Sequence, residues 1–307
     1  MTFRGAVRIS YATNSAAAIE EFLFSPWAAV RIMAQVDAAQ ATGQVQVSGF
    51  GATQRRDAWW AGPLATGLGL GAFLIYSTAR ALLNANYELG IGSHSGILRD
   101  HAYLLSPFYS PLIVLPAAWA WISPAFLVLW APGGFRVTCY YYRKAYYRAF
   151  FADPVGCAVG EPSSFCGFKR GLAYKGETKL LLFQNLHRYF LYFALIFLVL
   201  LSIDVNHSCR WPDGFGVSVG TLVLAANTTF LTLYTFSCHS LRHLVGGRLD
   251  CFSHATLGEP RHRLWSCASA LNKHHMFWAW TSLFGVGFAD FYVWMVASGR
   301  ITDLKLI

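Results

Sequence analysis

Histidines and cysteines, the residues that bind transition metals and haem, lie at the ends of several apolar stretches of this sequence. Thiolates and neutral imidazoles hold zinc ions and iron–sulfur clusters, and histidine also holds haem. The residues of these two types near such ends are Cys139, Cys157, His187, Cys238, His239, His243 and His275. Because three apolar stretches bring imidazole and two bring thiol to the same kind of boundary, the pattern predicts a metal or haem site.

The spacing of His239 and His243 is the most informative part of this set. Four residues apart, they share one face of a helix and can bind the same metal ion. Cys238 is about 100° around that helix from His239, and Arg242 could offset the charge of a thiolate. Two cysteines with two histidines suit either a closed zinc site or a two-iron cluster, and spacing alone does not separate these.

Two further chemistries use the same region. Imidazoles from opposing helices could clamp a haem, with His187 or His275 opposite His239 or His243. The tyrosine- and arginine-rich segment after Cys139 could instead line the site of a quinone headgroup. Its candidate residues are Tyr141, Arg143 and Tyr147. The alternative for this segment is an ordinary belt of tyrosine and arginine that anchors a protein at a membrane surface.

The elements that must position these residues are membrane-spanning helices. Of the 307 residues, 55% are hydrophobic, 16% aromatic and only 13% charged, which leaves too little polar surface for a soluble globule. Five apolar stretches approach the ~20 residues that a spanning helix needs. They are Trp60–Leu83, a stretch within Ala102–Phe135, Leu180–Ile203, Val217–Leu244 and Met276–Ser298. We therefore expect an all-α polytopic membrane protein, a bundle of five transmembrane helices.

Charged and proline residues refine this expectation. The five prolines of the second stretch predict a kinked helix packed against protein, and Asp290 inside the fifth stretch should face a partner rather than lipid. Lysine and arginine are concentrated before the first stretch, between the second and third, and between the fourth and fifth. The positive-inside rule therefore places the N-terminus, residues 132–179 and residues 245–275 in the cytoplasm. The net charge of +9 comes with no nucleic-acid-binding motif.

These patterns divide the chain into three parts. Residues 1–58 form an N-terminal cytoplasmic or interfacial segment, residues 59–299 a five-helix membrane domain, and residues 300–307 a short tail.

Five motifs carry a resemblance to a known family. They are Cys139-Tyr-Tyr-Tyr-Arg-Lys-Ala-Tyr-Tyr-Arg, Asp153-Pro-x-x-Cys157, Gln184-Asn-Leu-His-Arg, Cys238-His-Ser-Leu-Arg-His and His275-Met-x-x-Ala-Trp. In this order, over residues 60–295, the chain resembles the membrane-anchor subunit of actinobacterial, type F succinate dehydrogenase, a respiratory complex II.

The resemblance implies a multi-pass anchor in the bacterial cell membrane that docks a flavoprotein and an iron–sulfur subunit on its cytoplasmic face. The succinate and flavin site would lie on another chain. The resemblance also implies a Rieske-type [2Fe-2S] cluster, held by two cysteines and two histidines, that passes electrons to membrane quinone. From the pool above we favour Cys139, Cys238, His239 and His243 as ligands, with Cys157, His187 and His275 in reserve. Zinc, which has no redox function, does not suit this role.

Readings from other classes stay open at this point. The chain could be a haem b-binding anchor of another respiratory dehydrogenase, which a Soret band would reveal. It could also be a channel or transporter that uses Asp290 and Asn227 along its path, although the unusual residues gather at one face instead of across the membrane. The complex could further assemble into a higher oligomer.

Overall fold

The computed structural model describes residues 58–94, 100–150 and 180–307, apart from residues 59, 117, 118, 120, 248 and 250. The described part of the chain belongs to one compact unit. The expectations for residues 1–58, Ala58 apart, and the candidate ligand Cys157 lie outside the described residues.

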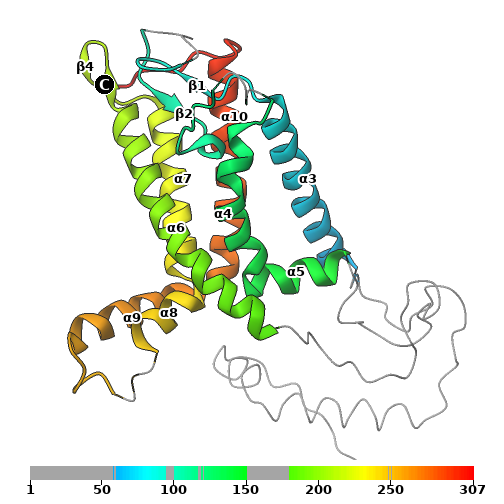
Figure 1. The fold of residues 1–307 in the computed structure, drawn as a ribbon, viewed down its shortest axis with the longest axis vertical. Helices are drawn as coiled ribbons and strands as arrows, with labels where there is room; N and C mark the ends of the chain where they lie inside the picture. The colour runs from blue at the N-terminus through cyan, green and yellow to red at the C-terminus, as the bar shows by residue number, and fades with distance from the viewer. Residues whose placement is uncertain are drawn as a thin grey trace, which may run out of the picture. The chain divides into compact units, whose positions relative to one another are not determined.

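Eight α-helices occur in the described residues, which confirms the all-α expectation. Five of them form a bundle: α3 (Ala61–Leu83), α4 (Pro124–Thr138), α6 (Leu180–Ser208), α7 (Val219–Phe236) and α10 (His275–Ala297). Three others, α5 (Tyr140–Phe150), α8 (His239–Gly246) and α9 (Gly258–Asn272), lie across the end where α6 and α10 begin (Figure 1). Within the bundle α7 packs on α10 and α6, and α6 packs on α4.

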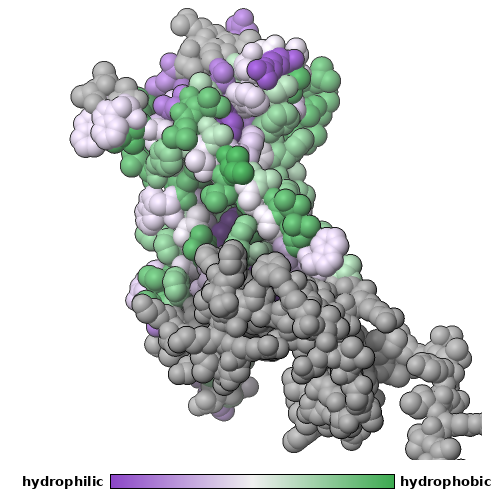
Figure 2. Space-filling model, turned by 90° about the vertical axis from the view of Figure 1, so that its right-hand side faces the viewer, coloured by the Kyte–Doolittle hydropathy of each residue, from purple (hydrophilic) through white to green (hydrophobic). Residues whose placement is uncertain are grey.

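Three of these helices are long and apolar enough to cross a membrane: α3, α7 and residues 185–208 of α6. The outer side of α3 exposes Leu64, Leu68, Leu74 and Ile75, and Figure 2 shows a largely apolar surface between the two ends of the bundle. The other two bundle helices, α4 and α10, are not among these three. Helix α4 has 15 residues, fewer than the ~20 of a typical span, whereas α10 has 23 residues.

The second predicted span is shorter than its apolar stretch. Between residues 102 and 122 the described residues contain strand β2 (Leu104–Leu105) and the 3-10 helix η1 (Pro107–Tyr109) rather than an α-helix. Each proline lacks a backbone N–H donor and disfavours helix in the residue before it, so closely spaced prolines prevent a helix. The helix α4 begins only at Pro124, in the first helical position where proline is tolerated.

The fourth predicted span also differs, because the helix is interrupted inside it. Helix α7 ends at Phe236, and Cys238 adopts an extended conformation with φ −67° and ψ 136° as the N-cap of α8. The Cys238 thiol accepts a hydrogen bond from the backbone N–H of Ser240 at 3.3 Å. His239 and His243 therefore belong to a separate helix, not to the end of the spanning helix.

Asp290 has a charged partner inside the bundle, as the sequence led us to expect. Its carboxylate pairs with Arg80 of α3 at 2.8 Å and accepts hydrogen bonds from Tyr76 at 2.6 Å and Ser106 at 2.5 Å. This network ties α3 and α10 to the loop that follows β2. That loop belongs to the end of the bundle opposite α5, where β1 (Glu88–Leu89) pairs antiparallel with β2.

The C-terminal residues pack on the start of α7 at this same end, near the hairpin β3 (Arg210–Trp211) and β4 (Gly214–Phe215). The backbones of Lys305 and Ser218 form an isolated antiparallel β-bridge. The Asp303 carboxylate accepts a hydrogen bond from the backbone N–H of Gly220 at 2.8 Å. Burial would raise the pKa of Asp303, but the hydrogen bonds that it accepts, from His101 and Gly220 among others, lower it. The tail is thus a fixed part of the membrane domain.

Candidate functional site

Four of the seven candidate ligands meet where the bundle helices reach α5 and α8. Cys139 follows α4, His187 lies in α6, Cys238 follows α7, and His275 begins α10. The Sγ atom of Cys238 lies 3.1 Å from Nε2 of His187, and Sγ of Cys139 lies 3.5 Å from Nε2 of His275. Four elements far apart in the sequence thus supply two thiol–imidazole pairs.

Both cysteines occupy the same kind of position, an extended link between two helices. Cys139 has φ −62° and ψ 129° between α4 and α5, and Cys238 has similar angles between α7 and α8. Each link ends a bundle helix and starts a helix that runs across its end. Both thiols are almost fully buried, with 3% and 2% of the residues exposed.

Hydroxyl groups orient both imidazoles. The Nδ1 atom of His187 lies 3.0 Å from Oγ1 of Thr138, which donates its proton to a backbone carbonyl of α4 at 2.7 Å. In the same way, Nδ1 of His275 lies 2.7 Å from Oγ of Ser237, which donates to a carbonyl of α7 at 2.8 Å. Because each hydroxyl proton is already used, the imidazole must donate from Nδ1, and its Nε2 lone pair faces the thiol.

Aromatic rings cover the two imidazoles. The Phe135 ring stacks on His187 with centroids 4.6 Å apart, and the Tyr234 ring stacks on His275 at 5.2 Å.

Burial raises the pKa of the Cys238 thiol to about 12, and the nearby Cys139 acts in the same direction. This thiol therefore keeps its proton unless a cation replaces it.

The arrangement does not suit a single metal ion. Among the described residues, no three or more His, Cys, Asp or Glu side chains converge on one point. A two-iron cluster needs only two protein ligands on each iron, and two buried thiols with two unprotonated Nε2 atoms are a donor set of this kind. These residues fit a [2Fe-2S] cluster by number, type and burial.

The favoured histidines of the sequence analysis lie elsewhere. His239 and His243 are exposed on α8, and their Nε2 atoms lie 3.0 Å from each other. Their spacing does place them together, and their two rings contact each other, whereas the thiols contact the two reserve histidines, His187 and His275. The physical reason is that α7 ends at Phe236, so His239 and His243 lie on α8, a separate helix that does not continue α7.

Arg242, which the sequence suggested could offset the charge of a thiolate, contacts two side chains of α9. The Arg242 guanidinium lies 5.5 Å from the centre of the Trp265 ring and donates to Asn272. Sequence reasoning missed Arg136, which lies in the last turn of α4 and contacts the aromatic residues around the thiols. Its position three residues before Cys139, one helical turn away, was the available signal.

The three candidate quinone residues all lie on α5, but they point to different neighbours. The Tyr141 hydroxyl accepts a hydrogen bond from Trp280 of α10 at 2.8 Å. Arg143 is only 1% exposed, and its guanidinium lies 5.4 Å from the Phe183 ring of α6. Tyr147 packs edge-on against Tyr146. Each of the three side chains thus contacts a different neighbour.

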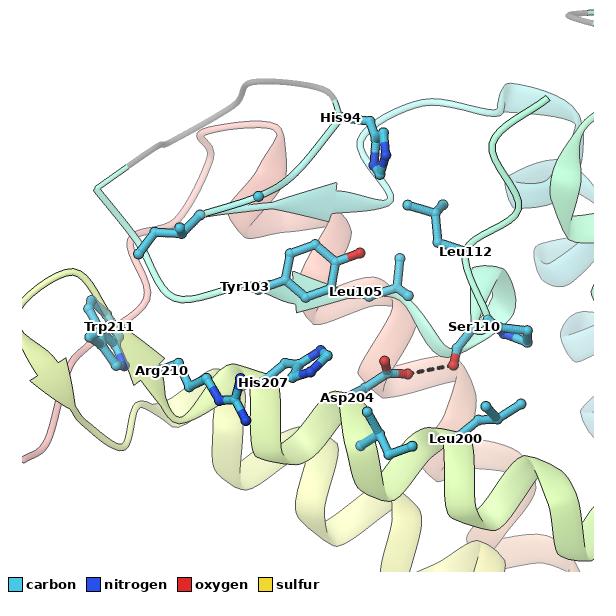
Figure 3. A pocket seen from close by; sticks show the side chains of 14 residues that line it. His94, Tyr103, Leu105, Ser110, Leu112, Leu200, Asp204, His207, Arg210 and Trp211 are labelled. Atoms are coloured by element: carbon cyan, nitrogen blue, oxygen red, sulfur yellow. Dashed lines mark hydrogen bonds between the residues drawn. The ribbon is translucent and has the colours of Figure 1, made fainter. Parts of the chain in front are cut away.

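A cavity of about 670 Å³ lies at the other end of the bundle, between the last turns of α6 and the segment around β2. Tyr103, Asp204 and His207 line it, and Ser110 donates a hydrogen bond to Asp204 (Figure 3). Along α6 the distance from His187 to Asp204 is roughly 25 Å at 1.5 Å per residue. The cavity is thus remote from the thiol–imidazole pairs.

Comparisons with known proteins place the chain in one family. Residues 61–299 match the sequence model of the family described as actinobacterial succinate dehydrogenase subunit SdhC. The chain is also similar to a chain in the solved structure of the Mycobacterium smegmatis Sdh1 complex in the apo form. The two are 39% identical, the match covers 83% of this chain and 94% of that chain, and the TM-score is 0.68. No curated protein matches the chain.

Proposed function

Since the chain belongs to the actinobacterial SdhC family of succinate dehydrogenase membrane-anchor subunits, we propose that it carries electrons through a Rieske-type [2Fe-2S] centre to membrane quinone. Family membership makes it a membrane subunit of a succinate dehydrogenase complex with partner subunits. The ligands in this proposal are Cys139, Cys238, His187 and His275.

The pairing of buried thiols with oriented imidazoles is the observation that carries this proposal. A metal-binding histidine almost always donates its other ring N–H to a neighbouring group, which fixes the ring and the tautomer. Thr138 and Ser237 accept those N–H groups here. The thiol facing each Nε2 favours an iron–sulfur centre over a haem, which would need two imidazoles that face one another across the macrocycle.

The cluster would supply one-electron transfer at a potential of roughly −150 to +300 mV, the range of histidine-ligated two-iron centres. The residues of this chain provide its setting. The two cysteines would hold the cluster as thiolates, and both imidazoles would hold it as neutral ligands that add no charge. Phe135 and Tyr234 cover the imidazoles and exclude water from the site.

The partner subunits would dock at the end that carries α5, α8 and α9. The distribution of lysine and arginine in the sequence supports a cytoplasmic location of this end. A flavoprotein would oxidise succinate on another chain, and an iron–sulfur subunit would deliver the electrons. We place quinone reduction near α5 and Tyr141, because electron tunnelling slows steeply with distance. The cavity near Asp204 is remote from the proposed ligands.

Histidine replacement in the complete complex tests the ligand set. We expect His187→Ala and His275→Ala, singly or together, to abolish the two-iron electron paramagnetic resonance signal and quinone reduction. Succinate oxidation with a soluble acceptor should continue. The matched control, His239→Ala with His243→Ala, changes two exposed histidines of α8, the helix that begins directly after Cys238, and should retain the signal.

The same experiment separates the alternatives. Loss of the signal in the control pair, with retention in the His187 and His275 variants, would return the ligand role to α8. A Soret band in the purified wild-type complex, with no two-iron signal from this subunit, would establish the haem-binding anchor instead.

A further inference from the structure

Arg136 is a half-buried cation at the end of α4 whose contacts are all with neutral groups. Its Nη1 donates to the Tyr142 hydroxyl at 2.6 Å and to the backbone carbonyl of Ala279 at 3.3 Å, and Nη2 donates to Ser282 at 3.1 Å. The guanidinium lies over the rings of Tyr142 and Tyr234, 5.6 and 4.8 Å from their centres. Three helices therefore hold it in one place.

No carboxylate of the described chain neutralises this charge. The ion pairs found among the described residues involve Arg80, Arg263, Lys305 and two histidines, and none involves Arg136. A cation away from bulk water is costly unless charge or polar contacts compensate it. Hydrogen bonds and two aromatic faces supply part of that compensation, and the net positive charge remains.

The uncompensated charge lies next to the proposed ligands. Tyr234, under the guanidinium, stacks on the imidazole of His275. Tyr142, its other aromatic neighbour, lies three residues after Cys139 and packs edge-on against Tyr234. One aromatic ring thus separates the cation from a ligand of the proposed centre.

The formal charges of the proposed cluster and its ligands indicate the effect of such a cation. Two ferric ions, two sulfides, two thiolates and two neutral imidazoles would sum to zero, and one electron delivered by the iron–sulfur subunit would bring the whole group to −1. No bond would form or break in this step. A fixed positive charge nearby stabilises the reduced form relative to the oxidised form, more strongly in a protein interior than in water.

We propose that Arg136 sets the reduction potential of the two-iron centre, as the fixed cation that favours its reduced form. This inference rests on the proposed function and goes beyond it by naming a residue that binds neither iron nor substrate. It assigns to Arg136 the charge-compensating role that the sequence suggested for Arg242. Arg136 acts on the cluster only through the electrostatic field of its charge, so it is a positioning residue and not a catalytic one.

A redox titration of the assembled complex, followed by electron paramagnetic resonance, tests this role. Arg136→Gln should make reduction at least tenfold less favourable, which is a drop of 59 mV or more in a one-electron potential. Arg136→Lys keeps the charge and should restore most of the difference. Arg300→Gln removes a cation that lies over Trp294 at the other end of α10 and should leave the potential unchanged.

A second variant keeps the test sharp if Arg136→Gln does not assemble. Ser282→Asp places a carboxylate where Arg136 already donates a hydrogen bond and neutralises the charge without removing the arginine. It should lower the potential in the same direction. An unchanged potential in either assembled variant overturns the role of Arg136, as does a change confined to the KM for quinone. A wild-type complex with no two-iron signal from this subunit overturns the proposed function itself.

Discussion

At the scale of single residues, Asp290 shows how this chain accommodates a charge inside an apolar bundle. Its carboxylate has no exposed surface and receives hydrogen bonds from Arg80, Tyr76 and Ser106. Every strong acceptor position therefore faces a donor. Removing one partner of such a buried pair costs more than removing both, because the remaining charge is left without compensation.

We expect Arg80→Met to destabilise the subunit by about 3–5 kcal/mol, the cost of an uncompensated buried charge. The double variant, Arg80→Met with Asp290→Leu, should lose less, since no buried charge remains. Thermal unfolding of the purified complex in detergent measures both. A single variant that is as stable as the wild type would show that water reaches Asp290 and that the pair is not buried in the assembled complex.

At the scale of helices, the close approach of α4 and α6 positions the candidate ligands. A Cβ atom built on Gly134 would lie 2.2 Å from the Phe190 ring, whereas one on Gly133 would meet nothing within 4 Å. Gly134 thus lets α4 approach α6 one turn before Thr138, which orients His187. The hydrogen bond from the imidazole depends on this spacing.

The two neighbouring glycines give a matched test. Gly134→Ala should push α4 and α6 apart, lower the thermal stability by about 1–3 kcal/mol as overpacking does, and weaken the two-iron signal. Gly133→Ala should be neutral or stabilise α4 by up to about 1 kcal/mol through helix propensity. Equal behaviour of the two variants in thermal unfolding and spectroscopy would show that helix spacing does not control the site.

At the scale of the whole molecule, α5, α8 and α9 form the surface expected to receive the partner subunits. Two arginines of α5 differ sharply there. Arg148 is exposed, whereas Arg143 is buried and lies over Tyr140 and Phe183. A charge reversal therefore probes docking at one position and the integrity of this chain at the other.

We expect Arg148→Glu to reduce the amount of soluble subunits that co-purify with the membrane chain, because it reverses a charge on the docking surface. The amount of the chain in the membrane should stay constant. Arg143→Glu should lower that amount itself, since it buries a carboxylate among aromatic rings. Affinity purification with quantification of each subunit checks both, and Arg300→Glu at the opposite end is the control. Full retention of the partners by Arg148→Glu would place the docking contacts elsewhere.

The amino-acid sequence by itself determined the class of molecule and offered a pool of candidate ligands. The excess of apolar residues requires helices that face lipid, because a soluble globule of this size could not hide them. Residue type and local position also indicated that Asp290 would have a buried partner, and they made Cys139 and Cys238 candidate ligands. Such inferences succeed because composition, charge and short spacings are local properties of the chain.

Only the tertiary structure decided which histidines meet the thiols. The spacing of His239 and His243 favoured them, but the end of α7 at Phe236 puts them on a separate helix. His187 and His275 reach the thiols because the packing of α4, α6, α7 and α10 brings four helix ends together. Where a helix stops, and what its end faces, depends on contacts between distant segments, and these contacts leave no periodic signal in the sequence.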